Sequence, residues 1–271
     1  MKKFSIILIL LLTATLTGCL STTTQKGSVG IDRQQLLLIS PAQITEGGKQ
    51  AYNAVLKEAK NTHTLLPTND PLVKRVRRIA NRIIPQTDVF RKDAPKWNWE
   101  VNVIKSDQLN AWAMPGGKIA FYTGIIEKLQ LTDNEIAAIM GHEVAHVLRE
   151  HGRERASQQT LTQVGLSALS IFTGVIGPAL DATALALQVT LTLPNSRTHE
   201  TEADRMGVEL AARAGYNPYA AVNVWKKMAK KSKGGSPPKI LSTHPSHENR
   251  IKDLTKYAKR VEPLFKASTR H

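Results

Sequence analysis

Cysteine, aromatic residues and acidic residues are all scarce in this sequence of 271 residues. The one cysteine, Cys19, leaves no intramolecular disulfide to form, and aromatic residues make up only 5% of the chain. Long apolar runs are also lacking, because residues 4–12 are too few for a span of about 20 residues and polar side chains interrupt residues 160–193. These absences exclude a disulfide-stapled fold, and they leave 160–193 to form core helices or a lid, or else a dimer or membrane contact.

The N-terminus has the organisation of a secretory signal peptide over residues 1–18. Lys2 and Lys3 supply the positive n-region, and residues 4–12 supply a short apolar core. The pattern resembles a bacterial lipoprotein signal, which implies cleavage before Cys19 and attachment of lipid to that residue. The alternatives are an ordinary signal peptide and an uncleaved membrane anchor.

Residues 19–40 are rich in small polar residues, and we interpret them as a lipidated, flexible tether. By resemblance to enterobacterial sorting, a residue other than Asp after the lipidated cysteine, here Leu20, favours the outer membrane facing the periplasm. The expected location is therefore the bacterial cell envelope, with Cys19 anchoring the chain in a membrane.

Basic residues outnumber acidic ones by 37 to 22, and a net charge of +13 remains once Lys2 and Lys3 are removed. Such clusters commonly form solvated helix faces, but they also attract anionic headgroups or acidic substrates. The sequence contains no nucleic-acid motif, and an exported lipoprotein makes nucleic acid an unexpected partner.

The remaining chain alternates between helical and extended patterns. Helices are predicted at about 43–60 and 70–84, and a half-buried strand at 97–103. A hairpin is predicted from 110–114 and 118–122, which flank a Pro-Gly-Gly turn. We therefore expect an α+β fold in which residues 41–265 form one mainly helical domain with a small sheet.

His142, Glu143 and His146 form the motif H-E-x-x-H within a predicted helix at about 132–157. Residues four apart share one face of a helix, so the two imidazoles can hold one zinc ion while Glu143 reaches a bound water. A chance match is the alternative, but buried polar groups in so apolar a helix need partners. His151 lies nine residues from His142, which predicts a structural or surface position.

A catalytic zinc requires a third protein ligand, and the helical pattern after residue 197 selects it. Glu200 and Asp204 fall on the apolar side of that helix, one turn apart, whereas Glu202 falls on a side that reads as solvent-exposed. We assign Glu200 as the zinc ligand and Asp204 as an acceptor from a zinc-bound imidazole. Gly207 is expected to let two helices approach closely.

H-E-x-x-H followed some 50 residues later by E-x-x-x-D resembles the gluzincin peptidases of the HtpX and CAAX prenyl protease family. Residues 110–117 and 241–245 match further stretches of that pattern, and the resemblance covers about 70–255. The soluble, exported branch with the BepA, LoiP and Oma proteases is more similar, because transmembrane helices are not predicted here. Unlike BepA, the sequence leaves no room for a repeat domain after Leu254.

The resemblance implies that residues 41–265 form a zincin-like metallopeptidase domain. It also implies that this domain is an endopeptidase that binds one Zn²⁺ per chain and cleaves unfolded or misassembled polypeptides. It implies that an extended substrate pairs with an edge strand of four residues: Asn110, Ala111, Trp112 and Ala113. It also suggests His244 as a fourth ligand or inhibitory switch, although the residue alone reads equally well as an exposed loop histidine.

Glu143 is expected to take a proton from the attacking water and deliver it to the leaving amine. Two other functions compete with this one. An envelope chaperone or scaffold would hold the zinc as a closed structural site, with His244 as its fourth ligand. A hydrolase of cell-wall or lipid bonds would use the same chemistry on another substrate. The sequence leaves the oligomeric state open.

Overall fold

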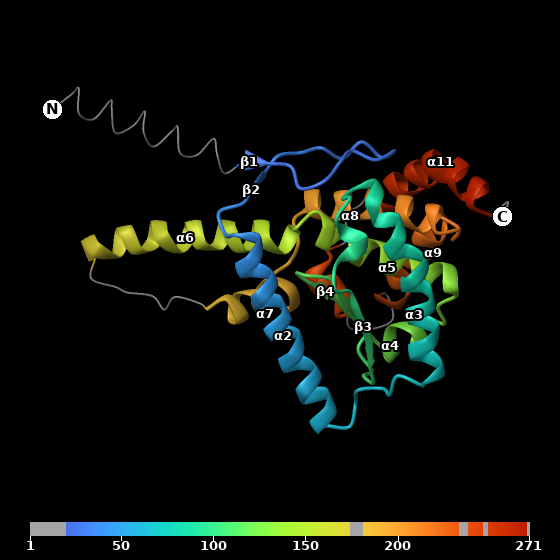
Figure 1. Cartoon of the computed structure of the whole chain (residues 1–271), viewed down its shortest axis with the longest axis horizontal. Helices are drawn as coiled ribbons and strands as arrows, with labels where there is room; N and C mark the ends of the chain where they lie inside the picture. Colours follow the sequence, from blue (N-terminus) through green and yellow to red (C-terminus); the bar gives the residue numbers. More distant parts are fainter. Residues whose placement is uncertain (1–19, 174–180, 233–237, 246–248, 270–271) are drawn as a thin grey trace.

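A computed structural model describes residues 20–173, 181–232, 238–245 and 249–269 (Figure 1). The predicted signal peptide at 1–18 and the lipidation site Cys19 lie outside these described residues. Within the described part of the chain, no helix combines the length and apolar character that crossing a membrane requires. The architecture is mainly helical with small sheets, which confirms the predicted α+β class.

A three-stranded sheet lies beside the helices, with strands β3 (Glu100–Ile104), β4 (Ala111–Met114) and β5 (Lys118–Tyr122) in the order β3-β5-β4. β5 runs parallel to β3 and antiparallel to β4, so the predicted hairpin is confirmed and β4 forms an edge of the sheet. Gly116 and Gly117 form its turn with φ of 83° and 78°, values that suit glycine.

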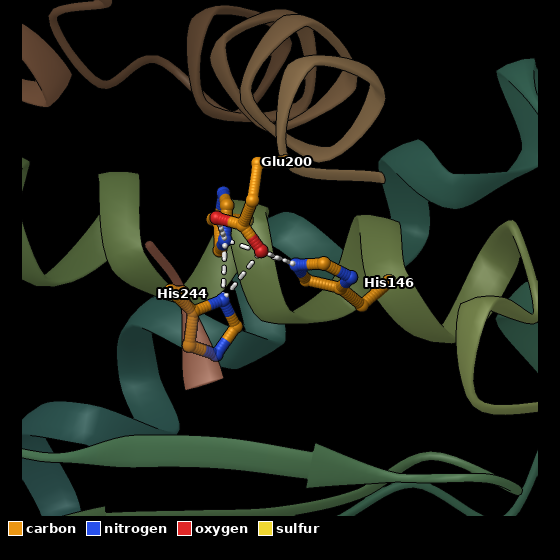
Figure 2. Close-up of side chains that lie close together, drawn as sticks. His146, Glu200 and His244 are labelled. Atoms are coloured by element: carbon orange, nitrogen blue, oxygen red, sulfur yellow. Dashed lines mark hydrogen bonds and ion pairs between the residues drawn. The ribbon is translucent and has the colours of Figure 1, made fainter. Parts of the chain in front are cut away.

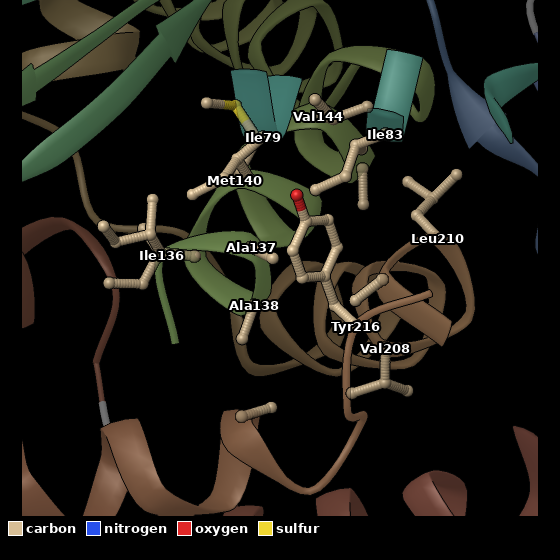
Figure 3. Close-up of a cluster of buried hydrophobic side chains, with 14 of the residues drawn as sticks. Ile79, Ile83, Ile136, Ala137, Ala138, Met140, Val144, Val208, Leu210 and Tyr216 are labelled. Carbon is tan, nitrogen blue, oxygen red and sulfur yellow. The ribbon is translucent and has the colours of Figure 1, made fainter. Parts of the chain in front are cut away.

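Helix α5 (Asp133–Leu148) carries the H-E-x-x-H motif through the centre of the largest apolar core. Thr132 and Glu135 form a capping box at its N-terminus, which fixes where the helix begins. α3 (Pro71–Ile83), α8 (Arg197–Arg213) and α9 (Ala220–Ser232) pack around it, and α11 (Arg250–Ser268) packs on α8. Figure 3 shows the side chains that fill the core between these elements: Ile79, Ile83, Ile136, Met140, Val144, Val208, Leu210 and Tyr216.

α5 and α8 touch backbone to backbone at Gly141 and Gly207. A Cβ atom on Gly141 would lie 2.6 Å from the carbonyl oxygen of Gly207, and one on Gly207 would lie 2.8 Å from the backbone nitrogen of His142. Contacts that short leave no room for any side chain, which confirms the close approach predicted at Gly207. This contact sets α8 directly against the motif helix.

α2 (Pro41–Asn61) and α7 (Ala182–Leu191) pack together and against the β4 side of the sheet. Leu185, Ala186 and Val189 of α7 are buried, so this part of the 160–193 region is core, as we favoured. α6 (His151–Thr173) starts at the motif helix and projects from the body of the molecule (Figure 1). The shorter elements are β1 (Leu20–Ser21), β2 (Gln35–Leu36), α4 (Thr123–Lys128), α10 (Ile240–Thr243) and the 3₁₀ helices Ile84–Val89 and Ala94–Lys96.

The N-terminal segment, residues 20–37, differs from the flexible tether that we predicted. β1 and β2 pair with each other, Val29 and Ile31 are buried, and the backbone N–H groups of Ser28 and Val29 each donate to Glu209 at 3.0 Å. The prediction of flexibility was wrong for these residues because a polar composition does not exclude hydrogen bonding to buried carboxylates of α8. Figure 1 shows this segment running along one side of the helical body.

The motif helix is also shorter than the predicted 132–157. It ends at Leu148, Glu150 takes a left-handed φ of 50°, and α6 starts in a new direction at His151. The argument from the nine-residue separation between His142 and His151 assumed a continuous helix, so the break removes that argument, although His151 is a buried, structural residue. The predicted strand at 97–103 begins three residues later, because Trp97 caps a 3₁₀ turn and stacks on Trp99 at 5.7 Å.

Candidate metal centre

Four side chains from three parts of the chain converge on one point: His142 and His146 of α5, Glu200 of α8, and His244, which follows α10. One ligand atom from each lies within 4.8 Å of all the others. Figure 2 shows the rings of His146 and His244 turned towards the carboxylate of Glu200. The structure therefore brings together the three predicted ligands and the proposed fourth residue.

The spacing of the ligand atoms suits a tetrahedral zinc ion. Nε2 of His142 lies 3.0 Å from Nε2 of His146 and 3.1 Å from Nδ1 of His244. Glu200 Oε1 lies 3.3 Å from His146 and 3.0 Å from His244. Tetrahedral zinc with metal–nitrogen bonds of about 2.0–2.1 Å separates its ligands by roughly 3.3 Å. The donor set of three imidazoles and one carboxylate therefore fits this metal.

His142 is held at its outer nitrogen by a carboxylate. Its Nδ1 lies 2.9 Å from Asp204, and Arg250 of α11 donates to both oxygens of Asp204 at 2.6 and 2.8 Å. Arg250 Nη1 also lies 2.7 Å from Glu200 Oε2. Such a carboxylate fixes the ring so that Nε2 presents its lone pair to a metal. The structure places Asp204 where we predicted it.

His146 is held at its outer nitrogen by another histidine. Its Nδ1 lies 2.8 Å from Nδ1 of His151, whose Nε2 lies 2.9 Å from Glu202. Both partners are buried, at 0% and 3% exposure. Glu202 was therefore wrongly predicted as a surface residue, because the N-terminal segment covers that side of α8 and sends Arg33 onto it.

The four converging groups strongly perturb one another. Burial lowers the pKa of His142, but the charges of Glu200 and Asp204 outweigh it and raise the pKa to about 9. Burial holds the pKa of His146 well below its ordinary value. Burial raises the pKa of Glu200, but His244, Arg250 and His142 outweigh that effect and hold it well below its usual range. The lowered pKa of Glu200 keeps its carboxylate anionic beside the imidazoles, as binding of a divalent cation requires.

Glu143 is buried at 2% exposure and faces the same point from beside His142. Its Oε1 lies 3.5 Å from His244 Nε2, and this oxygen has no hydrogen-bond partner among the described residues. Burial raises the pKa of the Glu143 carboxyl, and the positive charge of His244 and His142 opposes this only in part. A carboxyl with a raised pKa is suited to accept and return a proton near neutral pH.

A cavity of about 530 Å³ opens beside these groups, a volume typical of ligand sites. Glu143, His146 and His244 line its inner end, and α2, α7 and β4 contribute to its walls. Three buried donors that line it have no partner among the described residues, namely Nε1 of Trp112 and the Nε and Nη1 groups of Arg155. Free donors of this kind can bind carbonyl oxygens of a ligand.

The four residues of the predicted substrate strand divide into two pairs. Trp112 and Ala113 line the cavity, whereas Ala111 is fully buried and the Asn110 carbonyl accepts from the backbone N–H of Tyr122. In the described part of the chain, β4 pairs only with β5, so its other edge remains available. The structure therefore brings half of the predicted strand to the site.

Sequence reasoning missed Arg155 and Arg250. It predicted a structural or surface position for His151, which the structure shows as a buried partner of His146 outside the group of four converging side chains. Arg250 supports two acidic residues of α8 from a helix about 50 residues further along the chain, and no local pattern indicates that contact. Arg155 donates to the Val189 carbonyl and lines the cavity, a position that the break at Glu150 creates. An accumulation of charged residues in 149–155 is the one signal that the sequence offered.

An H-E-x-x-H helix, a glutamate from a second helix and a buried carboxyl facing a cavity define a metallopeptidase centre of the gluzincin type. A family model described as "Peptidase family M48" matches residues 72–258, and the chain belongs to this family of zinc-dependent metalloendopeptidases.

Curated relatives include enzymes of mitochondria and bacteria. The chain is 28% identical over 251 residues to mitochondrial metalloendopeptidase OMA1 of Saccharomyces cerevisiae, covering 88% of this chain and 70% of that protein. It is 32% identical over 240 residues to the OMA1 metalloendopeptidase of Bos taurus, covering 82% and 44%. It is 29% identical over 214 residues to the beta-barrel assembly-enhancing protease of Yersinia pestis, covering 74% and 42%. The chain thus spans less than half the length of the last two.

Proposed function

We propose that this protein is a zinc-dependent endopeptidase that cleaves unfolded or misassembled polypeptides in the bacterial envelope. The observation that carries the proposal is the position of Glu143, which is buried, lies beside the point where four metal-binding side chains meet, and has an Oε1 atom without a hydrogen-bond partner among the described residues. A structural metal site gives no reason to bury such a carboxyl at the end of a cavity.

The metal-binding residues and Glu143 have different roles in the reaction. His142, His146 and Glu200 hold the zinc, which when bound acidifies a water molecule and polarises the substrate carbonyl. Glu143 takes a proton from the attacking water and returns it to the leaving amine. Asp204 and Arg250 keep His142 and Glu200 in place during this transfer.

The cavity supports an extended peptide as substrate. The free edge of β4 offers backbone groups to a strand, while Trp112 and Arg155 offer side-chain donors along the cavity wall. Recognition through the main chain depends little on sequence, which suits unfolded polypeptides. Lipid ester bonds and glycosidic bonds lack the regular backbone donors and acceptors that a β edge pairs with.

His244 occupies the fourth corner of the metal cluster. A histidine there excludes a bound water, so the arrangement represents a self-inhibited state of the peptidase. Cleavage is expected to rise in His244→Ala, with zinc still bound by three ligands. A fall in cleavage at unchanged zinc content would instead give His244 a role in the reaction.

The proposed location rests on the sequence pattern of the N-terminus and on the bacterial relative. A lipid at Cys19 attaches the domain to a membrane, and the named activity of the Yersinia relative in β-barrel assembly favours quality control at the outer membrane, facing the periplasm. Unassembled polypeptides are the proposed partners there.

Zinc content and casein cleavage of the wild type and of Glu143→Gln test the proposal. The wild type is expected to bind one zinc per chain and cleave casein, and the variant to keep its zinc while losing activity by about 10²–10⁴-fold. Glu127→Gln on the exposed face of α4 is the matched control and should cleave normally.

A wild type that holds zinc but does not cleave, even with His244 replaced, would favour the scaffold with a structural zinc. The position of His244 in the fourth corner is the observation that keeps this second function in view. Cleavage that survives Glu143→Gln would remove the proposed mechanism.

A further inference from the structure

The side of His146 that faces away from the metal cluster begins a chain of buried polar groups. His146 Nδ1 lies 2.8 Å from His151 Nδ1, with the two ring planes at 72°. His151 Nε2 continues the chain to Glu202 Oε2 at 2.9 Å. His151, Glu202 and Arg149 are 0–3% exposed, so water does not replace these contacts.

Glu202 receives hydrogen bonds from two arginines as well. Arg33 donates to its two oxygens at 2.8 and 3.1 Å, and Arg149 donates at 3.3 and 3.4 Å. A carboxylate surrounded by two guanidinium groups acts as an acceptor only. The third contact, with His151, therefore requires that Nε2 of His151 carries the hydrogen.

That requirement determines the remaining hydrogens in the chain. A neutral His151 with its hydrogen on Nε2 has a lone pair on Nδ1, so it accepts from Nδ1–H of His146. His146 then has a lone pair on Nε2, the atom that faces His142 and Glu200. The opposite assignment would put a hydrogen on Nε2 of His146, and that ring could not bind a metal.

The N-terminal segment closes the far end of the chain. Arg33 also donates to Glu154 at 2.7 and 2.9 Å, and Gln35 donates to Glu154 at 2.7 Å. Arg149 in turn donates to the hydroxyls of Thr22 and Thr24, both at 3.1 Å. Residues 22–35 therefore hold the two arginines that hold Glu202.

We propose that His151 is a positioning residue for the metal ligand His146, and that Glu202, clamped by the N-terminal segment, fixes the hydrogen positions of both imidazoles. This proposal rests on the metal site of the proposed function, but it does not require peptide cleavage. A protein that binds zinc but does not cleave casein, even with His244 replaced, would contradict the endopeptidase and leave this chain of hydrogen bonds intact.

His199 provides a matched control for burial and ring stacking. It is 3% exposed and stacks on His151 with ring centroids 4.4 Å apart. Its Nε2 binds Glu154 at 3.1 Å, and none of its hydrogen bonds among the described residues reaches a metal ligand. If His151 only filled space, replacing either histidine would affect zinc binding equally.

The first experiment measures zinc affinity by competition with a chromophoric chelator, using the full-length protein. His151→Leu is expected to weaken zinc binding by about 10–100-fold, the range for residues that orient a metal ligand. His151→Gln, whose amide can accept from His146 and donate to Glu202, should bind zinc nearly as tightly as the wild type. His199→Gln should lose stability but keep its zinc affinity. Wild-type affinity in a folded His151→Leu, or equal losses in His151→Leu and His199→Gln, would overturn the proposal.

A second measurement needs no variant, so it stays decisive if His151→Leu does not fold. Nitrogen-15 spectra of histidine-labelled, zinc-loaded wild type report which ring nitrogen of each histidine carries a hydrogen. The proposal requires hydrogen on Nδ1 of His146 and on Nε2 of His151. A hydrogen on Nδ1 of His151 would disprove the proposed hydrogen-bond chain from His146 to Glu202.

Discussion

The two ligand histidines of α5 are supported in different ways at their outer nitrogens. His142 contacts the carboxylate of Asp204 directly, and Arg250 from α11 near the C-terminus holds that carboxylate. His146 reaches Glu202 through His151, and Arg33 from the N-terminal segment holds that carboxylate. Two carboxylates of the same helix, α8, thus anchor the two ligands, and opposite ends of the chain hold the carboxylates. Both ligand histidines therefore depend on arginines that lie far from α5 and α8 in the sequence.

The largest effect is expected when Arg250, which holds the carboxylate that supports His142, is replaced. Arg250→Met leaves two buried carboxylates, Asp204 and Glu200, without their cation, which is expected to destabilise the metal-free protein by about 3–5 kcal/mol. Urea unfolding monitored by circular dichroism measures the change. Arg205→Met, which breaks the partly exposed pair with Asp253, is the control and should lower stability by about 1 kcal/mol or less. Equal losses would show that Asp204 and Glu200 do not depend on Arg250.

A smaller effect is expected when Asp204, which contacts His142 directly, is compared with Glu202, which reaches His146 through His151. Asp204→Asn removes a charge in contact with a ligand, and we expect zinc affinity to fall by about 10–100-fold. Glu202→Gln removes a charge that acts through His151, and its loss should be smaller. Competition titrations of the two variants against the wild type compare them directly. The reverse order would mean that the relayed carboxylate matters more than the direct one.

The smallest effect concerns the pH dependence of stability that arises from Glu154, the buried carboxylate that binds Arg33 of the N-terminal segment. Burial raises the pKa of Glu154, but hydrogen bonds from Arg33, His199 and Gln35 outweigh it and hold that pKa far below the usual 4.5. A carboxyl with a lowered pKa in the folded state adds stability above about pH 4.5, and this stability is lost as the pH falls below that value. Melting temperatures between about pH 7 and pH 3 should therefore fall less steeply in metal-free Glu154→Gln. Parallel curves for variant and wild type would contradict the assigned role of Glu154.

Much of the centre could be predicted because its signals are local. The spacing in H-E-x-x-H places two imidazoles on one helical face, and the apolar neighbours of Glu200 and Asp204 show that both point inward. The capping box at Thr132 and the Pro-Gly-Gly turn are equally local, and the structure contains both.

The errors arose where tertiary contacts override local patterns. Glu202 and Glu209 lie on a face of α8 that reads as solvent-exposed, yet Arg33 and the backbone of Ser28 cover it. The contact between His151 and His146 was not predicted because Glu150, a residue other than glycine, adopts a left-handed conformation that nothing in its neighbourhood indicates. The cluster position of His244 came from family resemblance, since a histidine in a loop carries no local signal of its own.

The contact between Gly141 and Gly207 has a consequence for how this centre tolerates change. Because the two ligand-bearing helices rest main chain on main chain, the distance between them at this point is set by van der Waals contact of backbone atoms and not by the size of a core side chain. Substitutions elsewhere in the core can therefore accumulate without detuning the metal geometry. A single methyl group at either glycine would act as a wedge, moving Glu200 away from both imidazoles of α5 at once.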